Sequence, residues 1–591
     1  MILSNYYEDN PDLQFTIDHF VNWESFIPKH EKNFSDAKEY QETKNPNLEF
    51  APTSTEEAVE NAKLVFQQMG EIAGKELAAV AKEADKQGLK FHDGKVEFPE
   101  SLLKVLDIIQ ESGFLAYSCE RRYGGLHLSI TQEMPLLEML ARGDAAFAIY
   151  VGCFNLAAVL ERYAQKELIE EYVPKMTSGQ YTGAMALTEP DYGSDLPHIR
   201  TQAVKGEDGV WRITGTKRFI THACGVGDRP AVILTLARTG GEGAKGLSFF
   251  AVESTNVEIA RIEDKMGLHT SPTCEVVYDK TPAKLIGEEG KGLVKYAMGM
   301  MNGARMGIAI QGVGIAQAAL EEAKKYASER IQFGVPIEQI PAVRRLLDEM
   351  EAITQSLRAL TYHSAEVVDR AESTAKVLEE QGLSEREIRR HPDMGSLEKL
   401  AKLFTPVSKL FTSELANEVA YNAMQVFGGS GYTEEYDVAK IYRDARICVI
   451  YEGTSQLQVV AAIGGINEGM KEGGWAAEYL KQLISELKDA AVKEKLSAYV
   501  NRLIELVKIY KEKTRFEKDT LAWDMVWYFS WLVTYILMHK QKTIAKEKGL
   551  SDIVQMKEKA LKVYGLRAER EMEAIEYQVK NYQAPQEAVN A

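Results

Sequence analysis

Glu452 is the residue of this sequence best placed to act as a general base. It follows the apolar run Ile447-Cys448-Val449-Ile450 and Tyr451, and it precedes Gly453-Thr454-Ser455-Gln456. A carboxylate after such a run is expected to be partly buried. Burial raises the pKa of a carboxyl group into a range that suits proton abstraction. The alternative interpretation is a glutamate at a helix start that interacts with the helix dipole, and the motif alone favours that alternative.

Two strings in the middle of the chain carry groups that a ligand could use. The first is Leu187-Thr188-Glu189-Pro190-Asp191-Tyr192-Gly193-Ser194-Asp195, a strand end followed by a turn. Its N–H groups and hydroxyls could bind a polar ligand. The second string, Thr216–Thr221, places Phe219 two residues before Thr221, so that a ring and a hydroxyl could contact the same planar group. Taken alone, each string is better interpreted as an ordinary turn or as part of a core strand.

Two further strings lie at predicted helix ends. Arg330-Ile331-Gln332-Phe333-Gly334 closes a long helix, where an arginine either interacts with the helix dipole or binds a pyrophosphate. Phe427-Gly428-Gly429-Ser430-Gly431-Tyr432 separates two helices. Its glycines allow either close approach of a cofactor to the backbone or a simple turn.

The composition is typical of a globular protein. Of the 591 residues, 45% are hydrophobic and 27% are charged, with a net charge of −17. An acidic surface disfavours nucleic acid as a partner, and residues 471–591, with 21 basic and 18 acidic side chains, are the only weakly basic part. The five cysteines are far apart, which is typical of a reducing compartment. The first residues have no basic or apolar targeting segment, so we expect a cytoplasmic protein.

Periodicity divides the chain into helical and β parts. Apolar residues recur at helical spacing from about Ser54 to Val80, and further helices are predicted for 99–112, 131–145 and 165–176. Short apolar runs predict strands between 184 and 285, with a hairpin turn at Gly206-Glu207-Asp208-Gly209. Helices return after Gly290, at about 342–376, 396–427 and 453–465. The charged segment 376–395 is interpreted as a solvated insertion, and an all-helical extension ends the chain.

The strings above, in this order and spacing, resemble the acyl-CoA dehydrogenase family over about residues 50–465. The stretch from Gln425 through Gly428, Gly429, Gly431, Tyr432, Glu435, Lys440 and Asp444 fits a family signature throughout. The resemblance implies an α+β fold with a helical N-terminal domain, a middle β barrel and a C-terminal four-helix bundle. The predicted division is an N-terminal extension (1–50), the helical domain (51–183), the β domain (184–288), the bundle (289–466) and an extra helical domain (467–591).

The resemblance also implies FAD, with a set of contact positions. By position, the FAD contacts would be Leu187, Thr188, Phe219, Thr221, Gly428, Thr454 and Gln456. Residues that would reach the FAD of a neighbouring subunit are Arg330, Gln332, Phe333, Gln425 and Gly429. Such a shared site implies a homodimer or a dimer of dimers.

Substrate positions follow from the same resemblance. Ser194, Asn302 and Arg305 match positions that hold the acyl-CoA, together with Glu452 and Gly453. Some members carry the base at the position that matches Ala304. Alanine cannot act as a base, so Glu452 is the candidate. Asn302 stands where Asp is more usual.

Two other departures from the family pattern concern the shape of a turn and the subgroup to which the chain is similar. Tyr192 replaces a small residue and Pro341 replaces a glutamine. Pro341, the charged insertion and the extension together resemble a longer bacterial subgroup that includes the methylmercaptopropionyl-CoA dehydrogenases. No identified pocket residue demands that substrate.

The activity implied is α,β-desaturation of an acyl-CoA in fatty acid β-oxidation, with electrons passing to an electron-transfer flavoprotein. The alternatives are an acyl-CoA oxidase and a DNA-binding alkylation-response flavoprotein; no nucleic acid is expected. The apolar stretch Leu521–Met538 is interrupted by Asp524, and Trp523, Trp527 and Trp531 mark one helical face. We therefore expect a packed helix, with peripheral membrane contact as the less favoured alternative.

Overall fold

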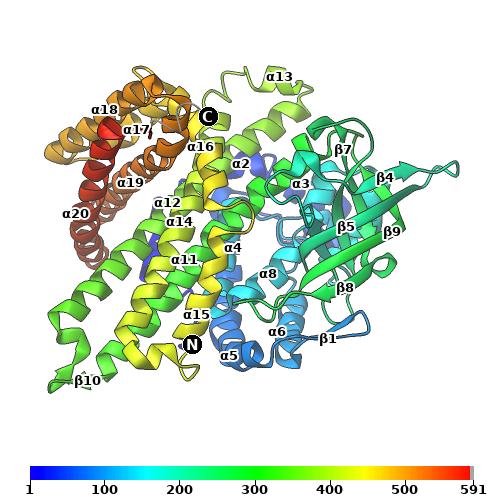
Figure 1. Ribbon diagram of the computed structural model, residues 1–591, viewed down its shortest axis with the longest axis horizontal. Helices are drawn as coiled ribbons and strands as arrows, with labels where there is room; N and C mark the ends of the chain where they lie inside the picture. Colours follow the sequence, from blue (N-terminus) through cyan, green and yellow to red (C-terminus); the bar gives the residue numbers. More distant parts are fainter. Residues whose placement is uncertain (586–591) are drawn as a thin grey trace. The chain divides into compact units, whose positions relative to one another are not determined.

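The computed structural model describes residues 1–585, which form two compact units (Figure 1). The β-containing unit comprises Met1–Tyr6 and Phe34–Ala304, and the helical unit comprises Tyr7–Asn33 and the described residues from Arg305 onward. The predicted α+β fold class is confirmed, with helices first, strands in the middle and helices at the end. The five-part domain division stays a prediction.

The helices of the β-containing unit begin at polar caps, as their sequence predicts. The Ser54 side chain accepts a hydrogen bond from the Glu57 backbone N–H at 3.2 Å and starts α4. Ser129 and Gln132 form a reciprocal capping box at the start of α7. The main helices are α4 (Thr55–Glu71), α5 (Ala78–Gln87), α6 (Glu100–Glu111), α7 (Ile130–Gly143), α8 (Ala145–Phe154), α9 (Ala157–Tyr163) and α10 (Lys166–Thr177).

Seven strands form the sheet of this unit, which closes on itself through pairing of β6 with β7. They are β3 (Thr182–Ala186), β4 (Gln202–Lys205), β5 (Trp211–Thr221), β6 (Ala231–Arg238), β7 (Leu247–Glu253), β8 (Glu258–Ile262) and β9 (Thr273–Ile286). The predicted hairpin is confirmed: Gln202 pairs with Thr214 and Lys205 with Trp211. Gly209 takes a φ of +78°, which a glycine adopts without strain.

The helical unit is built on long helices that run side by side (Figure 1). They are α11 (Met298–Glu329, which continues from the other unit), α12 (Pro341–Glu380), α14 (Leu397–Phe427) and α16 (Ser455–Gly469). The predicted apolar face of α11 is buried, from Val313 through Leu320 to Ala327. Pro341 is the first residue of α12, where its missing N–H costs nothing, so this departure from the family pattern fits the structure.

The described part of the C-terminal extension forms four helices, which agrees with the predicted all-helical character. They are α17 (Trp475–Ser485), α18 (Ala490–Glu512), α19 (Arg515–Glu547) and α20 (Ser551–Asn581). By length and composition α19 and Ala145–Tyr163 could each cross a membrane, but 83% of the apolar window of α19 is buried inside the protein. Trp531 packs against Phe411 of α14 with ring centroids 4.9 Å apart. Burial on this scale is that of a core helix and agrees with the packed-helix prediction.

A buried charge cluster joins three distant parts of the helical unit. Asp12, from the short helix α1 (Pro11–Phe15), accepts hydrogen bonds from Arg358 of α12 and Lys557 of α20. Arg358 also donates to Gln317 of α11 at 2.8 Å. Burial alone would raise the pKa of Asp12, but the charges of Lys557 and Arg358 hold it below the usual value. The N-terminal segment is therefore part of the helical unit's core.

Three parts of the chain differ from the sequence interpretation. Residues 1–40, for which no helix or strand was predicted, form short helices, including α2 (Ile27–His30) and α3 (Ser35–Thr43). Segment 376–395 is not simply solvated, because Leu378, Ile388 and Met394 form a small core of their own. The sequence interpretation also missed two short hairpins, β1 (Lys90–His92) with β2 (Lys95–Glu97), and β10 (Ile331–Gln332) with β11 (Val335–Pro336).

The charge cluster predicts a large loss of stability on neutralising Asp12. Asp12→Asn leaves Lys557 and Arg358 buried without their anion, which typically costs about 3–5 kcal/mol. The urea midpoint of unfolding, followed by tryptophan fluorescence, should fall, since five of the six tryptophans lie in the helical unit. Because the pKa of Asp12 is lowered in the fold, its contribution is present at neutral pH and is lost as pH falls through that lowered value. Asp519→Asn, at an exposed pair with Arg515, is the control and should leave the midpoint unchanged.

Candidate active site

Glu452 lies in a short loop between two helical segments. The loop follows the turn Arg446–Val449 and precedes α16, whose N-terminus is capped by Thr454. Glu452 stands two residues before that cap, so it is not a residue of the first helical turn. Its backbone φ is +54°, and that of Gly453 is +90°. A non-glycine residue in this left-handed region costs about 1–3 kcal/mol and persists only where surrounding contacts hold it.

The environment of Glu452 raises its proton affinity. Burial raises the pKa of the Glu452 carboxyl group to about 7, and the positive charges of Arg305 and Lys409 limit the rise. The residue as a whole is half-buried. Burial in turn lowers the pKa of Lys409 to about 8. A carboxylate that can take up a proton near neutral pH is suited to general-base catalysis.

Polar side chains that the sequence interpretation did not single out surround this loop. Lys409 of α14 donates to the Gly453 carbonyl at 2.8 Å, and Gln458 of α16 donates to the same oxygen at 2.8 Å. Tyr451 donates its hydroxyl to Gln311 of α11. No local signal marks Lys409 in the sequence, because a single lysine in a helical pattern normally faces solvent.

The β-containing unit holds the second group of predicted residues. Leu187 and Thr188 follow β3, and Phe219 and Thr221 end β5. The Arg218 backbone N–H donates to the Thr188 carbonyl at 3.0 Å, which joins the two strings that were separate in the sequence. Phe219 is 54% exposed and has a φ of +63°. An exposed aromatic ring beside two threonines can stack on a planar ligand.

A buried ion pair supports this region. Lys217 is fully buried and donates to the Leu187 carbonyl at 2.8 Å and to Glu189 at 3.0 Å. Glu189 also accepts the backbone N–H groups of Arg200 and Thr201 at 2.7 and 2.9 Å. The four contacts fix the course of the chain after β3.

Tyr192, the departure from the family signature, is accommodated in this turn. Its backbone pairs with Glu189 in both directions, at 2.9 and 3.2 Å, and the Arg200 guanidinium lies 5.2 Å from its ring centroid. Ser194, two residues further on, is exposed. The larger side chain therefore leaves the turn intact.

The third group lies at one end of the long helices. Arg330, Gln332 and Phe333 occupy the end of α11 and the β10–β11 turn, and all three are exposed. Tyr326 of α11 stacks on Phe427 with centroids 4.1 Å apart, which brings this helix end beside the turn Gly428–Tyr432. Gln425, Gly428 and Gly429 are also exposed, and the space around both glycines is open.

The structure therefore groups the predicted residues within each unit. In the helical unit, Arg305 lies close enough to Glu452 for their charges to interact. Asn302, one turn before Arg305 on α11, belongs to the β-containing unit. Thr454 and Gln456, at the start of α16, are exposed.

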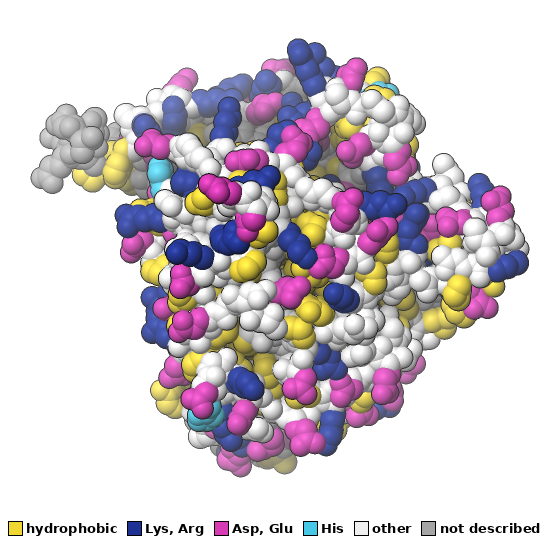
Figure 2. All heavy atoms as spheres, turned by 90° about the vertical axis from the view of Figure 1, so that its right-hand side faces the viewer, with side chains coloured by type: hydrophobic (Ala, Val, Ile, Leu, Met, Phe, Trp, Pro, Cys, Tyr) yellow, Lys and Arg dark blue, Asp and Glu magenta, His cyan; other side chains and the backbone are white. Residues whose placement is uncertain are grey.

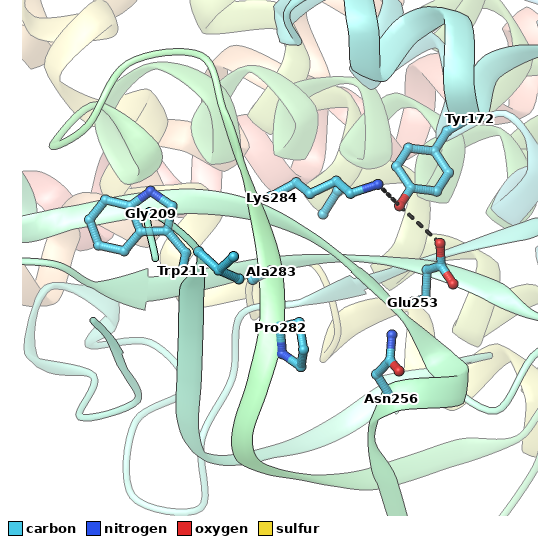
Figure 3. A pocket seen from close by; sticks show the side chains of 10 residues that line it. Tyr172, Gly209, Trp211, Glu253, Asn256, Pro282, Ala283 and Lys284 are labelled. Carbon is cyan, nitrogen blue, oxygen red and sulfur yellow. Dashed lines mark hydrogen bonds between the residues drawn. The ribbon is translucent and has the colours of Figure 1, made fainter. Parts of the chain in front are cut away.

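A separate hollow of ≈ 410 Å³ lies on the β-containing unit (Figure 3). Tyr172 donates its hydroxyl to Glu253 at 3.1 Å and accepts a hydrogen bond from Lys284 at 3.1 Å, on one side of the hollow. Trp211 and Pro282 line the other side. None of the predicted site residues lines this hollow.

Comparison with known proteins identifies the family. Three family models match in order: the acyl-CoA dehydrogenase N-terminal domain over residues 60–180, the middle domain over residues 184–281 and the C-terminal domain over residues 290–463. The chain belongs to the acyl-CoA dehydrogenase family. It is therefore a flavin-dependent oxidoreductase, and its cofactor is FAD.

Individual relatives and solved structures support the same family assignment. The 3-methylmercaptopropionyl-CoA dehydrogenase of Ruegeria pomeroyi is 31% identical over 80% of this chain and 78% of its own length. An acyl-CoA dehydrogenase from Bacillus anthracis, solved with FAD, is 23% identical, covers 90% of both chains and has a TM-score of 0.74. A chain in a structure of the electron transferring flavoprotein of Acidaminococcus fermentans is 30% identical, covers 68% of this chain and 97% of its own, and has a TM-score of 0.56. The Bacillus likeness shows a shared fold that continues past residue 463.

The residues present fit FAD. The exposed Phe219 ring with Thr188 and Thr221 offers stacking and hydrogen bonds to a flavin ring. Open space around Gly428 and Gly429 leaves the backbone reachable, and the exposed Arg330 carries a guanidinium that can pair with a pyrophosphate. Their assignment to individual FAD atoms stays a prediction.

Arg330→Ala should release FAD more readily than the unmodified protein does. The substitution removes the guanidinium that would pair with the pyrophosphate, and a neutral side chain cannot replace it. Flavin retained after dialysis, measured by absorbance, reports the loss, and size-exclusion chromatography reports any weakening of a dimer. Arg515→Ala, at a fully exposed arginine of α19, is the matched control. Equal retention in both variants would contradict the assignment.

Proposed function

We propose that this chain desaturates an acyl-CoA thioester to the trans-2-enoyl-CoA, with Glu452 as the base that removes the α-proton. The observation that carries this proposal is the Glu452 carboxylate, held in a left-handed loop beside the charges of Arg305 and Lys409, with a pKa that burial raises to about 7. A group of this kind, in a family whose members act on acyl-CoA, has the chemistry that α-proton removal requires.

The residues of this chain would divide the work as follows. A Glu452 oxygen forms a bond to the α-proton, and the electrons of the broken C–H bond form the new double bond as hydride leaves the β-carbon. FAD, when bound, supplies the hydride acceptor. The positive charge of Arg305 stabilises the Glu452 carboxylate before the transfer. The backbone N–H of Glu452 would stabilise charge on the thioester oxygen, since fixed donors in a dry site do so at little reorganisation cost.

Electron transfer to an electron-transfer flavoprotein completes the proposed cycle. Support comes from the likeness to a chain in the Acidaminococcus fermentans flavoprotein structure. Ser194, Asn302 and Arg305 remain the proposed acyl-CoA contacts. We also propose a homodimer or a dimer of dimers, a cytoplasmic location and a role in fatty acid β-oxidation. A panel of acyl-CoAs with an artificial acceptor would identify the chain length.

Two alternatives are tested directly. An acyl-CoA oxidase would show rapid reoxidation of reduced flavin when air is admitted after anaerobic reduction. A DNA-binding flavoprotein would shift DNA in a salt-dependent gel assay. The net charge of −17 weighs against the second alternative. On the face shown in Figure 2, basic and acidic side chains are intermixed, which also disfavours DNA binding.

Glu452→Gln should keep the fold and the FAD but lose most flavin reduction by substrate. Gln is nearly isosteric, so packing survives, while the basic oxygen is lost; a general base typically contributes about 10²–10⁴ in rate. Anaerobic stopped-flow bleaching of the flavin measures the loss. Bleaching at the unmodified rate would show that Glu452 is not the base.

The double variant Glu452→Gln with Ala304→Glu should recover part of that rate. Position 304 carries the base in some family members, and the small Ala304 side chain leaves that role to Glu452. Ala304→Glu alone is the control for packing effects. A double variant as slow as Glu452→Gln would show that a carboxylate at position 304 cannot reach the substrate.

The rate of flavin reduction should fall as the pH is lowered through about 7. Glu452 must be deprotonated to act, and burial raises its pKa to about 7 against the opposing charges of Arg305 and Lys409. The acid limb of the bleaching rate, measured from pH 5.5 to 9, reports this titration. A midpoint near the ordinary pKa of glutamate would contradict the burial that the structure shows.

A further inference from the structure

The carbonyl groups of Glu452 and Gly453 are held by two buried donors from different helices. Lys409 Nζ donates to the Gly453 oxygen at 2.8 Å. Gln458 Nε2 donates to the Gly453 oxygen at 2.8 Å and to the Glu452 oxygen at 3.3 Å. Both donor side chains are fully buried. The Gly453–Thr454 peptide is thus fixed from both α14 and α16, and the Glu452–Gly453 peptide from α16.

Lys409 differs from the other buried lysines of the described chain in its partner. Lys217, Lys440 and Lys557 each form an ion pair with a carboxylate, at Glu189, Asp444 and Asp12 respectively. Lys409 instead donates to a backbone carbonyl of the loop. Burial of an ammonium group costs several kcal/mol unless it is compensated, so a lysine placed here for packing alone would be unfavourable.

The loop is strained and needs such contacts. Glu452 and Gly453 both have positive φ, at +54° and +90°. A Cβ added at Gly453 would lie 2.8 Å from Gln458 Nε2, so a larger residue at this position would displace the donor. Without the two donors, the loop would lower its free energy by relaxing Glu452 to an ordinary backbone conformation.

We propose that Lys409 and Gln458 form a clamp that positions Glu452, by holding the peptides on either side of Gly453 so that Glu452 keeps its left-handed conformation. The clamp keeps the carboxylate and the backbone N–H of Glu452 in one fixed orientation. This inference rests on the proposed function, in which Glu452 is the base. Both members are positioning residues, since they contact the loop and not the reacting atoms.

The two members contribute differently because only one is charged. Lys409 faces Glu452, Arg305, Cys448 and Glu414, and its charge favours the carboxylate form of Glu452. Gln458 donates to the same Gly453 carbonyl without a charge. Loss of Lys409 should therefore change both the geometry and the titration of Glu452, whereas loss of Gln458 should change the geometry alone.

The test compares Lys409→Met and Gln458→Leu with Lys402→Met. Lys402 lies on the same helix, α14, but its side chain is 62% exposed and pairs with Glu398. Each FAD-loaded protein is mixed anaerobically with butyryl-CoA and with octanoyl-CoA between pH 5.5 and 9. Hydrogen exchange of the segment 449–458 and the melting temperature are measured on the same samples without substrate.

We expect bleaching on the order of 10²-fold slower in Lys409→Met and Gln458→Leu at saturating acyl-CoA, since small displacements of a catalytic group cost about that much. Exchange of the segment should be about tenfold faster in both variants. The acid limb should move to higher pH in Lys409→Met and stay in place in Gln458→Leu. Lys402→Met should match the unmodified protein.

Distinct results overturn the clamp and the proposed function. Variants that melt earlier but bleach at the unmodified rate would show a purely structural role and overturn the clamp. An unmoved acid limb in Lys409→Met would overturn the charge contribution of Lys409. The proposed function fails if neither acyl-CoA bleaches the flavin of the unmodified protein and Glu452→Gln is equally inert. Hydrogen exchange of the segment 449–458 would still test the clamp in that case.

Discussion

The central constraint of this structure is that a buried carboxylate must remain able to lose and regain a proton. Transfer of an isolated carboxylate into a protein interior strongly favours the neutral form. At Glu452 the charges of Arg305 and Lys409 oppose burial, and the resulting pKa is about 7. Without those charges the pKa of Glu452 would be higher and less of the group would be ionised near neutral pH, and without burial it would be a weaker base. The long helices of the helical unit serve this balance by holding both cations close to the loop.

A second regularity concerns the loops that carry the predicted site. On the β-containing unit, the fully buried Lys217 donates to the carbonyl of Leu187; on the helical unit, the fully buried Lys409 donates to the carbonyl of Gly453. In each case an ammonium group fixes the backbone beside a candidate functional residue. A lysine is suited to this task because its long stem spans a packed interior while its three N–H donors satisfy several acceptors. The two cases differ in that Lys217 also pairs with Glu189.

Local signals in the sequence predicted much of this fold, whereas contacts between distant parts of the chain could not be predicted from the sequence. The turn at Asp208-Gly209 is specified by residues that favour φ above zero, so the hairpin could be recognised. Strand β9 continues through Pro282, although a proline normally ends a strand or lies at its edge, and a register shift near Lys280 precedes it. The association of residues 7–33 with α12 and α20 depends on Asp12 meeting a lysine 545 positions away, which no local pattern records.

The same distinction explains which parts of the candidate site could be found. Glu452 is marked by the apolar run before it and by the glycine after it, both local features. Lys409 carries no such mark, since a single lysine in a helical pattern normally faces solvent. Its role becomes visible only when α14 and α16 are packed and the Gly453 carbonyl lies 2.8 Å from Nζ. The base is therefore encoded locally, whereas its basicity depends on charges brought to it by the tertiary structure.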